Sequence, residues 1–216
     1  QSLRRLGTDY IDLYQIHWPN PKTPLEDTLR AFDDLVRQGK VRYIGNSNFD
    51  GAQVDAAAAV SREHKLAAFS SAQNHYSLLT RNIEQDLVPA CGRNGLGILP
   101  FFPLESGLLT GKYKRGETPP EGTRLGNAVR DKNSGMARFL EDAKFVKVEK
   151  LQALTAATGN MTLLDMAFGW LLSRPYVACV IAGATKSEQV EANVKAAAWR
   201  PSAEVARQID AITLGA

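Results

Sequence analysis

The spacing of apolar stretches is the feature that most narrows the fold of this chain. Four strand-like stretches recur about every thirty residues, and a helical pattern follows each of them. We predict these strands over residues 11–16, 41–45, 68–73 and 97–101. One strand and one helix of this combined length form the βα unit of a parallel sheet, whose right-handed crossovers cover the sheet. Spacing alone leaves two α/β architectures open, a doubly wound sheet and a (β/α)8 TIM barrel.

Capping and stop signals predict helices between these strands. Thr23-Pro24-Leu25-Glu26 matches a capping box with proline in the first helical position, and Gly39 is placed to end that helix. Asp50 and Gln53 are expected to cap a second helix. A third helix is predicted from residue 80 or 81 to about residue 93.

The second half of the chain departs from this rhythm. Residues 105–138 are rich in Gly, Lys, Arg and Pro, which is typical of a long loop. Two interpretations of this loop are about equally favoured: a lid that covers a cofactor, and a disordered surface insertion. The remaining predicted elements are helices over 139–157 and 163–172, a fifth strand over 176–181, a helix capped by Thr185 with Glu188 three residues on, and a last helix from Ser202.

Composition and charge exclude several classes of function. The 216 residues fit one domain, and a formal net charge of +3 without a clustered basic stripe argues against nucleic-acid binding. No apolar run reaches the length of a membrane span and no signal peptide follows Gln1, so we expect a cytoplasmic protein. Cys91 and Cys179 give neither a disulfide framework nor metal spacing, and Cys179 is expected to be a buried, inert thiol. The sequon Asn160-Met161-Thr162 is interpreted as a helix start.

Two common nucleotide-binding motifs are missing. No Gly-x-Gly-x-x-Gly follows any predicted strand, which excludes the Rossmann fingerprint. The stretch from Gly107 to Lys112 is one residue short of a P-loop and lacks a hydroxyl residue after the lysine. Both of these phosphate-binding loops are therefore excluded.

Polar and aromatic residues stand at the ends of the predicted strands, where barrel folds place their chemistry. His17 ends the first strand, and a neutral imidazole there can donate a hydrogen bond to a substrate oxygen. Ser47, Asn48 and Gln73 end the next two strands, and Phe101 ends the fourth. Each residue has an ordinary alternative: a packed histidine, a helix cap at Ser47 or Asn48, or a core aromatic.

Five stretches together resemble the aldo-keto reductase family, especially its bacterial and channel-β-subunit-like branches. In the family's order and spacing they are residues 9–19, 45–49, 73–79, 97–113 and 181–193. The resemblance implies a (β/α)8 TIM barrel, of which this chain covers about strands 4 to 8 as a single domain over residues 1–216. His17 would end the fourth strand and Ile181 the eighth. The first three βα units, which in the family supply an Asp, a proton-donating Tyr and a Lys, have no counterpart here.

The resemblance also implies roles for individual residues. His17 would polarise the substrate carbonyl, and Trp18 would form one wall of the substrate pocket. Ser47, Asn48 and Gln73 would hold the carboxamide of a nicotinamide ring. The full implied cofactor-binding set is Ser47, Asn48, Gln73, Phe101, Phe102, Pro103, Leu104, Ser106, Gly107, Leu108, Gly183, Thr185, Lys186, Gln189 and Asn193.

Within this set, Phe101 would stack on the nicotinamide ring in place of the family's usual Tyr. Residues 106–108 would line the pyrophosphate path. Lys186 opens a helix whose free N–H groups suit phosphate, and it would pair with the 2′-phosphate of NADP, which favours NADP over NAD. Gln189 and Ala182 stand where many relatives have an Arg and a Pro.

The implied function is NADPH-dependent reduction of a small aldehyde or ketone, with no metal. An alternative from another class is a catalytically silent nicotinamide-binding regulatory protein of the same fold. A third candidate, a barrel enzyme that binds a phosphorylated substrate at Lys186, does not explain Ser47, Asn48 and Gln73 together. Because the family's Asp, Tyr and Lys are missing, we expect little or no activity from the 216 residues alone. The natural substrate and the oligomeric state are left open.

Overall fold

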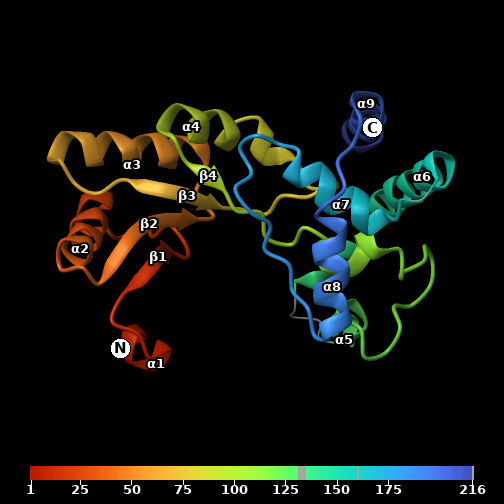
Figure 1. Ribbon diagram of the computed structural model, residues 1–216, viewed down its shortest axis with the longest axis horizontal. Helices are drawn as coiled ribbons and strands as arrows, with labels where there is room; N and C mark the ends of the chain where they lie inside the picture. The colour runs from red at the N-terminus through yellow and green to blue at the C-terminus, as the bar shows by residue number, and fades with distance from the viewer. Residues whose placement is uncertain (131–134, 160, 216) are drawn as a thin grey trace. The chain divides into compact units, whose positions relative to one another are not determined.

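The chain forms two compact units in the computed structural model of Figure 1, which describes residues 1–130, 135–159 and 161–215. The first unit comprises residues 1–75 and 82–99, and the second comprises residues 76–81 and the chain from residue 100 onward. Each unit has its own set of fully buried apolar side chains.

The first unit is a parallel sheet covered by helices. Its strands are β1 (Ile11–Ile16), β2 (Val41–Ser47), β3 (Phe69–Gln73) and β4 (Gly97–Ile98), in the spatial order β1-β2-β3-β4 with every pairing parallel. Its helices are α1 (Ser2–Leu6), α2 (Leu25–Arg37), α3 (Gly51–His64), η1 (Asn82–Glu84) and α4 (Leu87–Asn94). The four strands predicted from the apolar spacing are confirmed, although β4 is shorter than predicted.

Side-chain alternation gives this sheet two different faces. The Tyr14 ring packs at 5.5 Å from the ring of Phe32 in α2, and Ile44 is 1% exposed on the same face. Tyr43 precedes Ile44 and is 63% exposed, because successive side chains of a strand point to opposite faces. The figure shows α3 and α4 on one side of the sheet (Figure 1). Because all the strands are parallel, their carboxyl ends lie along one edge of the sheet.

Two predicted helix starts in this unit have different outcomes. The capping box of α3 is confirmed: the Asp50 carboxylate accepts the Gln53 N–H at 2.8 Å, and the Gln53 side chain accepts the Asp50 N–H at 3.0 Å. The capping box at Thr23 is wrong, because the Thr23 hydroxyl accepts a bond from Asn20 Nδ2 at 2.9 Å and α2 begins without a side-chain cap. Gly39 follows α2 with a φ of 68°, which glycine adopts at little cost.

The third predicted helix begins later than expected. Residues 82–84 form only the short η1, and the regular helix α4 starts at Leu87. Asp86 interrupts the helical path with a φ of −130°, and its carboxylate accepts the Gly51 N–H at 3.1 Å. A tertiary hydrogen bond to the start of α3 therefore decides where α4 begins.

The second unit is helical. Its elements are η2 (Glu105–Thr110), α5 (Arg124–Arg130), η3 (Met136–Leu140), α6 (Asp142–Thr158), α7 (Leu163–Leu172), α8 (Ser187–Ala196) and α9 (Ala203–Leu214). The predicted helix starts at Thr162 and Ser202 are confirmed, because their hydroxyls accept N–H groups three residues on, at 3.1 and 3.3 Å. Trp170 and Phe139 are fully buried in this unit.

Two predictions for the end of the chain are wrong. Residues 176–181 form no strand in the part of the chain that the structure describes; the Ile181 N–H donates to the Pro100 oxygen at 3.0 Å, and one such bond is not a ladder. Thr185 does not cap α8: Lys186 is the residue that precedes the helix, and the Thr185 hydroxyl donates to Gln189 Oε1 at 3.3 Å instead of accepting a helix N–H.

Two further expectations concern single segments. Cys179 is exposed rather than buried, since the strand expected to enclose it does not form. The irregular interval 105–138 contains η2, α5 and part of η3, so its described residues are not one continuous loop. Asn160 of the sequon lies outside the described residues.

Candidate functional site

The carboxyl ends of β1, β2 and β3 bring four predicted residues into one hydrogen-bonded group, the strand-end cluster of His17, Ser47, Asn48 and Gln73. The Asn48 amide donates to the His17 carbonyl oxygen at 2.9 Å and to Ser47 Oγ at 3.1 Å. The Ser47 hydroxyl and the Asn48 N–H both donate to the Gln73 carbonyl oxygen, at 2.8 and 3.1 Å. Parallel strands end at a shared edge, so residues far apart in the sequence meet here.

The backbone of Asn48 makes this arrangement possible. Its φ is 61°, in the left-handed region that Asn tolerates better than most residues. The chain turns there from β2 towards α3, and the Asn48 side chain reaches back to β1. The alternative in which Ser47 or Asn48 caps α3 is excluded, because Asp50 is the cap.

Two functional groups of the cluster stay available to a ligand. Among the described residues, no hydrogen bond is recorded for the His17 imidazole or for the side-chain amide of Gln73. His17 is exposed, and its ring lies 5.8 Å from the ring of Trp18, which is 61% exposed. The exposed imidazole can donate a hydrogen bond to a substrate oxygen. The exposed indole beside it can pack against the apolar part of the same substrate.

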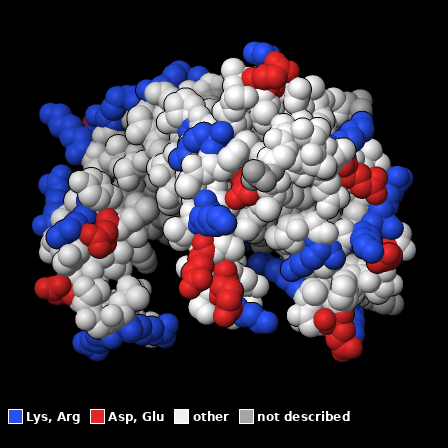
Figure 2. All heavy atoms as spheres, turned by 45° about the vertical axis from the view of Figure 1, so that its right-hand side comes forward, with Lys and Arg blue, Asp and Glu red and all other residues white. Residues whose placement is uncertain are grey.

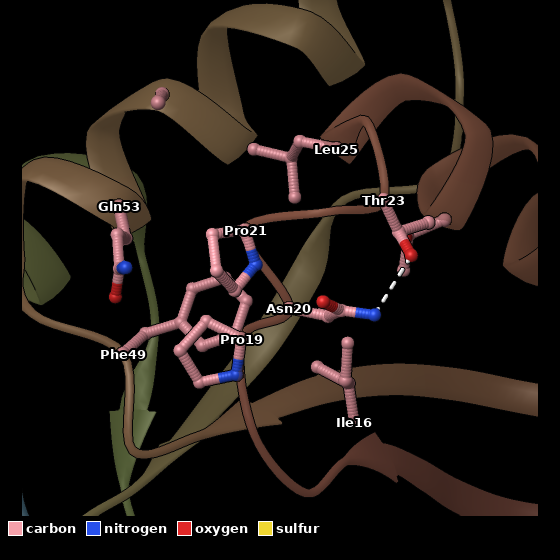
Figure 3. Close-up of a pocket in the computed structure, with 10 residues that line it drawn as sticks. Ile16, Pro19, Asn20, Pro21, Thr23, Leu25, Phe49 and Gln53 are labelled. Carbon is pink, nitrogen blue, oxygen red and sulfur yellow. Dashed lines mark hydrogen bonds between the residues drawn. The ribbon is translucent and has the colours of Figure 1, made fainter.

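A hollow of about 310 Å³ lies next to the loop that joins β1 to α2 (Figure 3). Pro19, Pro21 and Phe49 form its apolar wall, and Gln53 comes from α3. Neither His17 nor Trp18 belongs to its lining. This hollow is therefore not the substrate pocket predicted from the sequence.

The second unit holds the other predicted cofactor residues, beginning with the segment 101–107. Phe102, Glu105 and Ser106 have φ values of 53°, 47° and 57°, and Gly107 has 97°. Each non-glycine residue in this region costs about 1–2 kcal/mol. Such strain concentrates at ligand sites, which supports a functional segment here.

The polar groups of this segment differ in availability. The Gly107 N–H donates to the Leu104 oxygen at 2.8 Å and is occupied. The Ser106 hydroxyl is buried, and it has no hydrogen-bond partner among the described residues. A buried hydroxyl without a partner calls for a ligand or a water molecule. Leu108 is fully buried in this unit, and Pro103 is buried there too.

The last predicted group gathers at the start of α8. The Thr185 N–H and hydroxyl both donate to Gln189 Oε1, at 2.8 and 3.3 Å. Gly183 and Lys186 are exposed just before the helix. Asn193 is half-buried and lines a hollow of about 370 Å³ formed by α7, α8 and the segment before α8. Gln189 thus closes the turn that precedes the helix and leaves the Lys186 side chain exposed.

Glu105 and Asn46 are among the buried polar residues that the sequence did not reveal. Glu105 is fully buried, and its carboxylate accepts hydrogen bonds from Ser77 Oγ at 2.6 Å and Thr80 Oγ1 at 2.9 Å. Asn46 is fully buried too, and its side chain has no partner within the described ranges. An acidic residue inside the apolar run from Phe101 to Leu109 is a signal that points to Glu105. No comparable signal marks Asn46.

Other kinds of site have little support in the described part of the chain. No group of three or more His, Cys, Asp or Glu residues there could hold a metal ion, and no helix there is long and apolar enough to cross a membrane. Burial raises the pKa of the Cys91 thiol to about 11, with a further contribution from the charges of Asp55 and Asp86, so Cys91 is not a nucleophile at neutral pH. Figure 2 shows basic and acidic side chains interspersed on the visible face.

A parallel sheet with polar groups gathered at the carboxyl ends of its strands is the arrangement found at the ligand sites of barrels and of doubly wound sheets. The chain matches the Aldo/keto reductase family over residues 1–214, and it belongs to that family.

Relatives of known name and structure agree with this assignment. The chain is 34% identical, over 98% of its length, to a putative voltage-gated potassium channel subunit beta of Schizosaccharomyces pombe, of which it covers 61%. It is also 34% identical to the NADH-specific methylglyoxal reductase of Escherichia coli, over 90% of this chain and 56% of that protein.

A crystal structure of the thermostable aldo-keto reductase Tm1743 matches with a TM-score of 0.74 and 31% identity, over 98% of this chain and 63% of that one. The chain therefore spans less than two thirds of these relatives. Its fold is part of a (β/α)8 barrel, as predicted.

Proposed function

We propose that the protein containing this chain is an NADP-dependent oxidoreductase that reduces small aldehydes or ketones to alcohols. The observation that carries this proposal is the strand-end cluster, in which Asn48 ties the end of β1 to the end of β2. Family membership supports carbonyl reduction in general. The cofactor, the substrate class and the residue roles are proposals, because the chain covers only part of its relatives.

The residues present fit a nicotinamide cofactor in two respects. The side-chain amide of Gln73 lies at the carboxyl end of β3, has no hydrogen-bond partner among the residues that the structure describes, and is complementary to the donor and acceptor of a carboxamide. The buried Ser106 hydroxyl lacks a partner within the described residues and can donate to a phosphate oxygen. When bound, the cofactor would supply the hydride for reduction.

His17 acts on the substrate carbonyl in this mechanism. Its imidazole donates a hydrogen bond to the carbonyl oxygen and stabilises the negative charge that develops during reduction. The hydrogen bond from Asn48 to the His17 carbonyl fixes the backbone that carries the ring. The exposed indole of Trp18 offers an apolar wall to the substrate. Proton delivery falls to the family's Tyr, which has no counterpart in these 216 residues.

NADP is favoured over NAD by the start of α8. Lys186 is exposed there, beside helix N–H groups and the positive end of the helix dipole. Its ammonium group would pair with the 2′-phosphate that only NADP carries. NAD is the lesser alternative, since Gln189 replaces the arginine of many relatives, and one similar protein is named NADH-specific.

A catalytically silent nicotinamide-binding regulatory protein is the second candidate. The similarity to a protein named as a potassium channel subunit favours it. This candidate retains the cofactor-binding residues but predicts no turnover.

Binding and turnover measurements on the complete protein separate these candidates. Titration with NADPH and with NADH, followed by fluorescence quenching, should show tighter binding of NADPH. Oxidation of NADPH with 4-nitrobenzaldehyde should then show hydride transfer. Binding without turnover of any aldehyde or ketone would support the regulatory candidate, and failure to bind either nucleotide would contradict both.

The 216-residue chain alone is expected to oxidise little or no NADPH. Its sheet ends at β1 and β4, and unpaired strand edges favour aggregation. Robust turnover by these residues alone would refute the assignment of the proton donor to the missing units. We also propose a cytoplasmic location for the complete protein, which cell fractionation would test.

A further inference from the structure

We propose that Glu105 is a positioning residue for cofactor binding. Its buried carboxylate, paired with Lys144, holds the segment 101–107 in the strained conformation that presents Ser106 to the cofactor. The inference rests on the proposed function, because it takes this segment to be part of the cofactor site. It adds two residues, Glu105 and Lys144, that the sequence analysis does not include.

The carboxylate of Glu105 is saturated with hydrogen-bond donors from separate segments. Oε1 accepts from Ser77 Oγ at 2.6 Å and from Thr80 Oγ1 at 2.9 Å, and Oε2 accepts from Lys144 Nζ at 2.9 Å. The side chain of Glu105 is 0% exposed and that of Lys144 is 16% exposed. A carboxylate that accepts hydrogen bonds on both oxygens is fixed in position.

The partners of Glu105 are themselves ordered. Ser77 Oγ accepts the N–H groups of Leu79 and Thr80, at 3.1 and 3.0 Å, which closes a tight turn. Lys144 belongs to α6, a helix of 17 residues. Glu105 therefore joins the segment 101–107 to a closed turn and to a long helix.

Lys144 also supports the aromatic part of the segment. Its Nζ lies 5.1 Å from the centroid of the buried Phe139 ring. That ring packs edge-on against Phe102 at 5.3 Å, and Phe102 packs against Phe101 at the same distance. One ammonium group thus links the carboxylate of Glu105 to the two phenylalanines of the predicted cofactor set.

The backbone of the segment explains why such a clamp is needed. Phe102, Glu105 and Ser106 all have positive φ values, and only Gly107 adopts this region without strain. Residues with a strained backbone persist only where the surrounding contacts stabilise that conformation by more than the strain costs. Glu105 is one of the strained residues and makes the charged contacts itself. Loss of its charge should therefore let the segment relax.

The ionic character of the clamp indicates a positioning role. A buried ion pair seldom stabilises a fold more than apolar residues of the same shape, but it can specify one conformation. Here the specified conformation contains a buried Ser106 hydroxyl with no partner in the described residues. Removal of the clamp should weaken cofactor binding and leave hydride transfer from bound cofactor nearly unchanged.

Four variants of the complete protein test this inference. Glu105→Gln and Lys144→Met each break the buried pair, and the double variant removes both charges. Arg115→Gln is the matched control, because it breaks the exposed pair between Arg115 and Asp142 of α6. The measurements are the NADPH Kd, kcat at saturating NADPH, the melting temperature, and hydrogen exchange of residues 101–113 without cofactor.

Glu105→Gln should raise the NADPH Kd by about tenfold or more while kcat at saturation changes by less than about twofold. Exchange over 101–113 should accelerate in the cofactor-free protein. The double variant should regain part of the melting temperature lost by the single variants, because no buried charge is left unpaired. Its Kd and its exchange should remain altered, which a purely structural role does not predict. Arg115→Gln should match the parent in all four measurements.

Unchanged Kd and exchange in Glu105→Gln would overturn the inference, even if the melting temperature fell. Full recovery of Kd in the double variant would also overturn it, since the pair would then serve stability alone. Failure of the proposed function has a different signature: the parent and Arg115→Gln would themselves fail to bind NADPH or NADH. That result would overturn both proposals.

Discussion

The strand-end cluster and the segment 101–107 position their predicted ligand-binding residues by two different kinds of contact. In the cluster, neutral hydrogen bonds run from Asn48 and Ser47 to backbone oxygens, and the His17 imidazole stays exposed. In the segment, a buried charged pair fixes a strained backbone around a buried hydroxyl. A parallel sheet already brings strand ends together, so short neutral contacts suffice there. A loop has no such frame and needs stronger contacts to hold one conformation.

This difference predicts two kinds of mutational response. Side-chain changes at the strand-end cluster should alter the chemistry more than the folding free energy. Changes to the buried charges of the second unit should alter folding and its pH dependence first. The variants below test this contrast, from the largest expected effect to the smallest.

His17→Ala should lower turnover of the complete protein by about a hundred- to a thousand-fold, the usual effect of removing one oxyanion donor. The NADPH Kd should change little, and the free energy of unfolding should stay within about 0.5 kcal/mol of the parent, because the side chain is exposed. Steady-state kinetics and denaturant titration measure both. His64→Ala, on α3, is the control and should keep full turnover. Unimpaired turnover in His17→Ala would refute the role assigned to His17.

Gly45→Ala tests whether sheet geometry sets the cluster. A Cβ at this position would lie 2.3 Å from Ser71 Oγ and 3.1 Å from both Gln15 Cγ and the Ser71 carbonyl oxygen, so the Ser71 side chain must rotate and the neighbouring strands must give by a few tenths of an ångström. The expected loss is about 1–3 kcal/mol of folding free energy, together with reduced turnover. Gly92→Ala is the control: its Cβ meets nothing within 4 Å in α4, and alanine favours the helix. Equal stability of the two variants would argue against a tight β2–β3 contact.

Asp210→Asn tests the charged contacts of the second unit. Asp210 Oδ1 accepts hydrogen bonds from Arg81 at 2.7 Å and Arg174 at 2.8 Å, and the Arg81 side chain is 8% exposed. Removal of the charge weakens the pairing of the buried Arg81 guanidinium. Because Asp210 is itself one-third exposed, we expect a loss of about 2 kcal/mol at pH 7 rather than the larger cost of a fully buried pair.

The effect of Asp210→Asn should depend on pH. Burial alone would raise the pKa of Asp210, but the Arg81 hydrogen bond and the charges of Arg174 and Arg81 outweigh it and hold the pKa below its usual value. The stabilisation is therefore complete above about pH 4 and is lost as the pH falls through the lowered pKa. Denaturant titrations of parent and variant should converge on acidification. A constant difference down to the lowest accessible pH would contradict this account.

Asn48→Gly and Asn48→Ala separate two roles of one residue. Both variants lose the hydrogen bonds to His17 and Ser47, and both should weaken NADPH binding. Glycine keeps the φ of 61° without strain, whereas alanine does not, so the alanine variant should be less stable by about 1 kcal/mol. Equal stability of the two would show that the left-handed backbone is not a constraint here.

The sequence was most informative where local contacts decide the structure. The strands β1 to β3 and the Asp50 cap follow from apolar patterning and from a bond between neighbours in the chain. The predictions at Thr23 and Thr185 failed because other side chains, Asn20 and Gln189, compete for the same groups.

Predictions that depended on distant contacts fared differently. The strand over 176–181 needs a partner strand to form a ladder, which apolar composition cannot guarantee. The cluster was anticipated as a set of residues, but its internal bonds were not, because they depend on the left-handed turn at Asn48. Glu105 escaped notice because its donors, at 77, 80 and 144, are distant in sequence. The ligand roles assigned to the site residues stay predictions.

The contrast between the two cysteines has a practical consequence. Cys91 is buried, with its pKa raised to about 11, whereas Cys179 is exposed beside the hollow that Asn193 lines. Thiol-directed dyes at neutral pH should consequently attach to Cys179 and spare Cys91 without any engineering of the sequence. A fluorophore there would sit next to α8 and could report nucleotide binding optically, independently of any enzymatic assay.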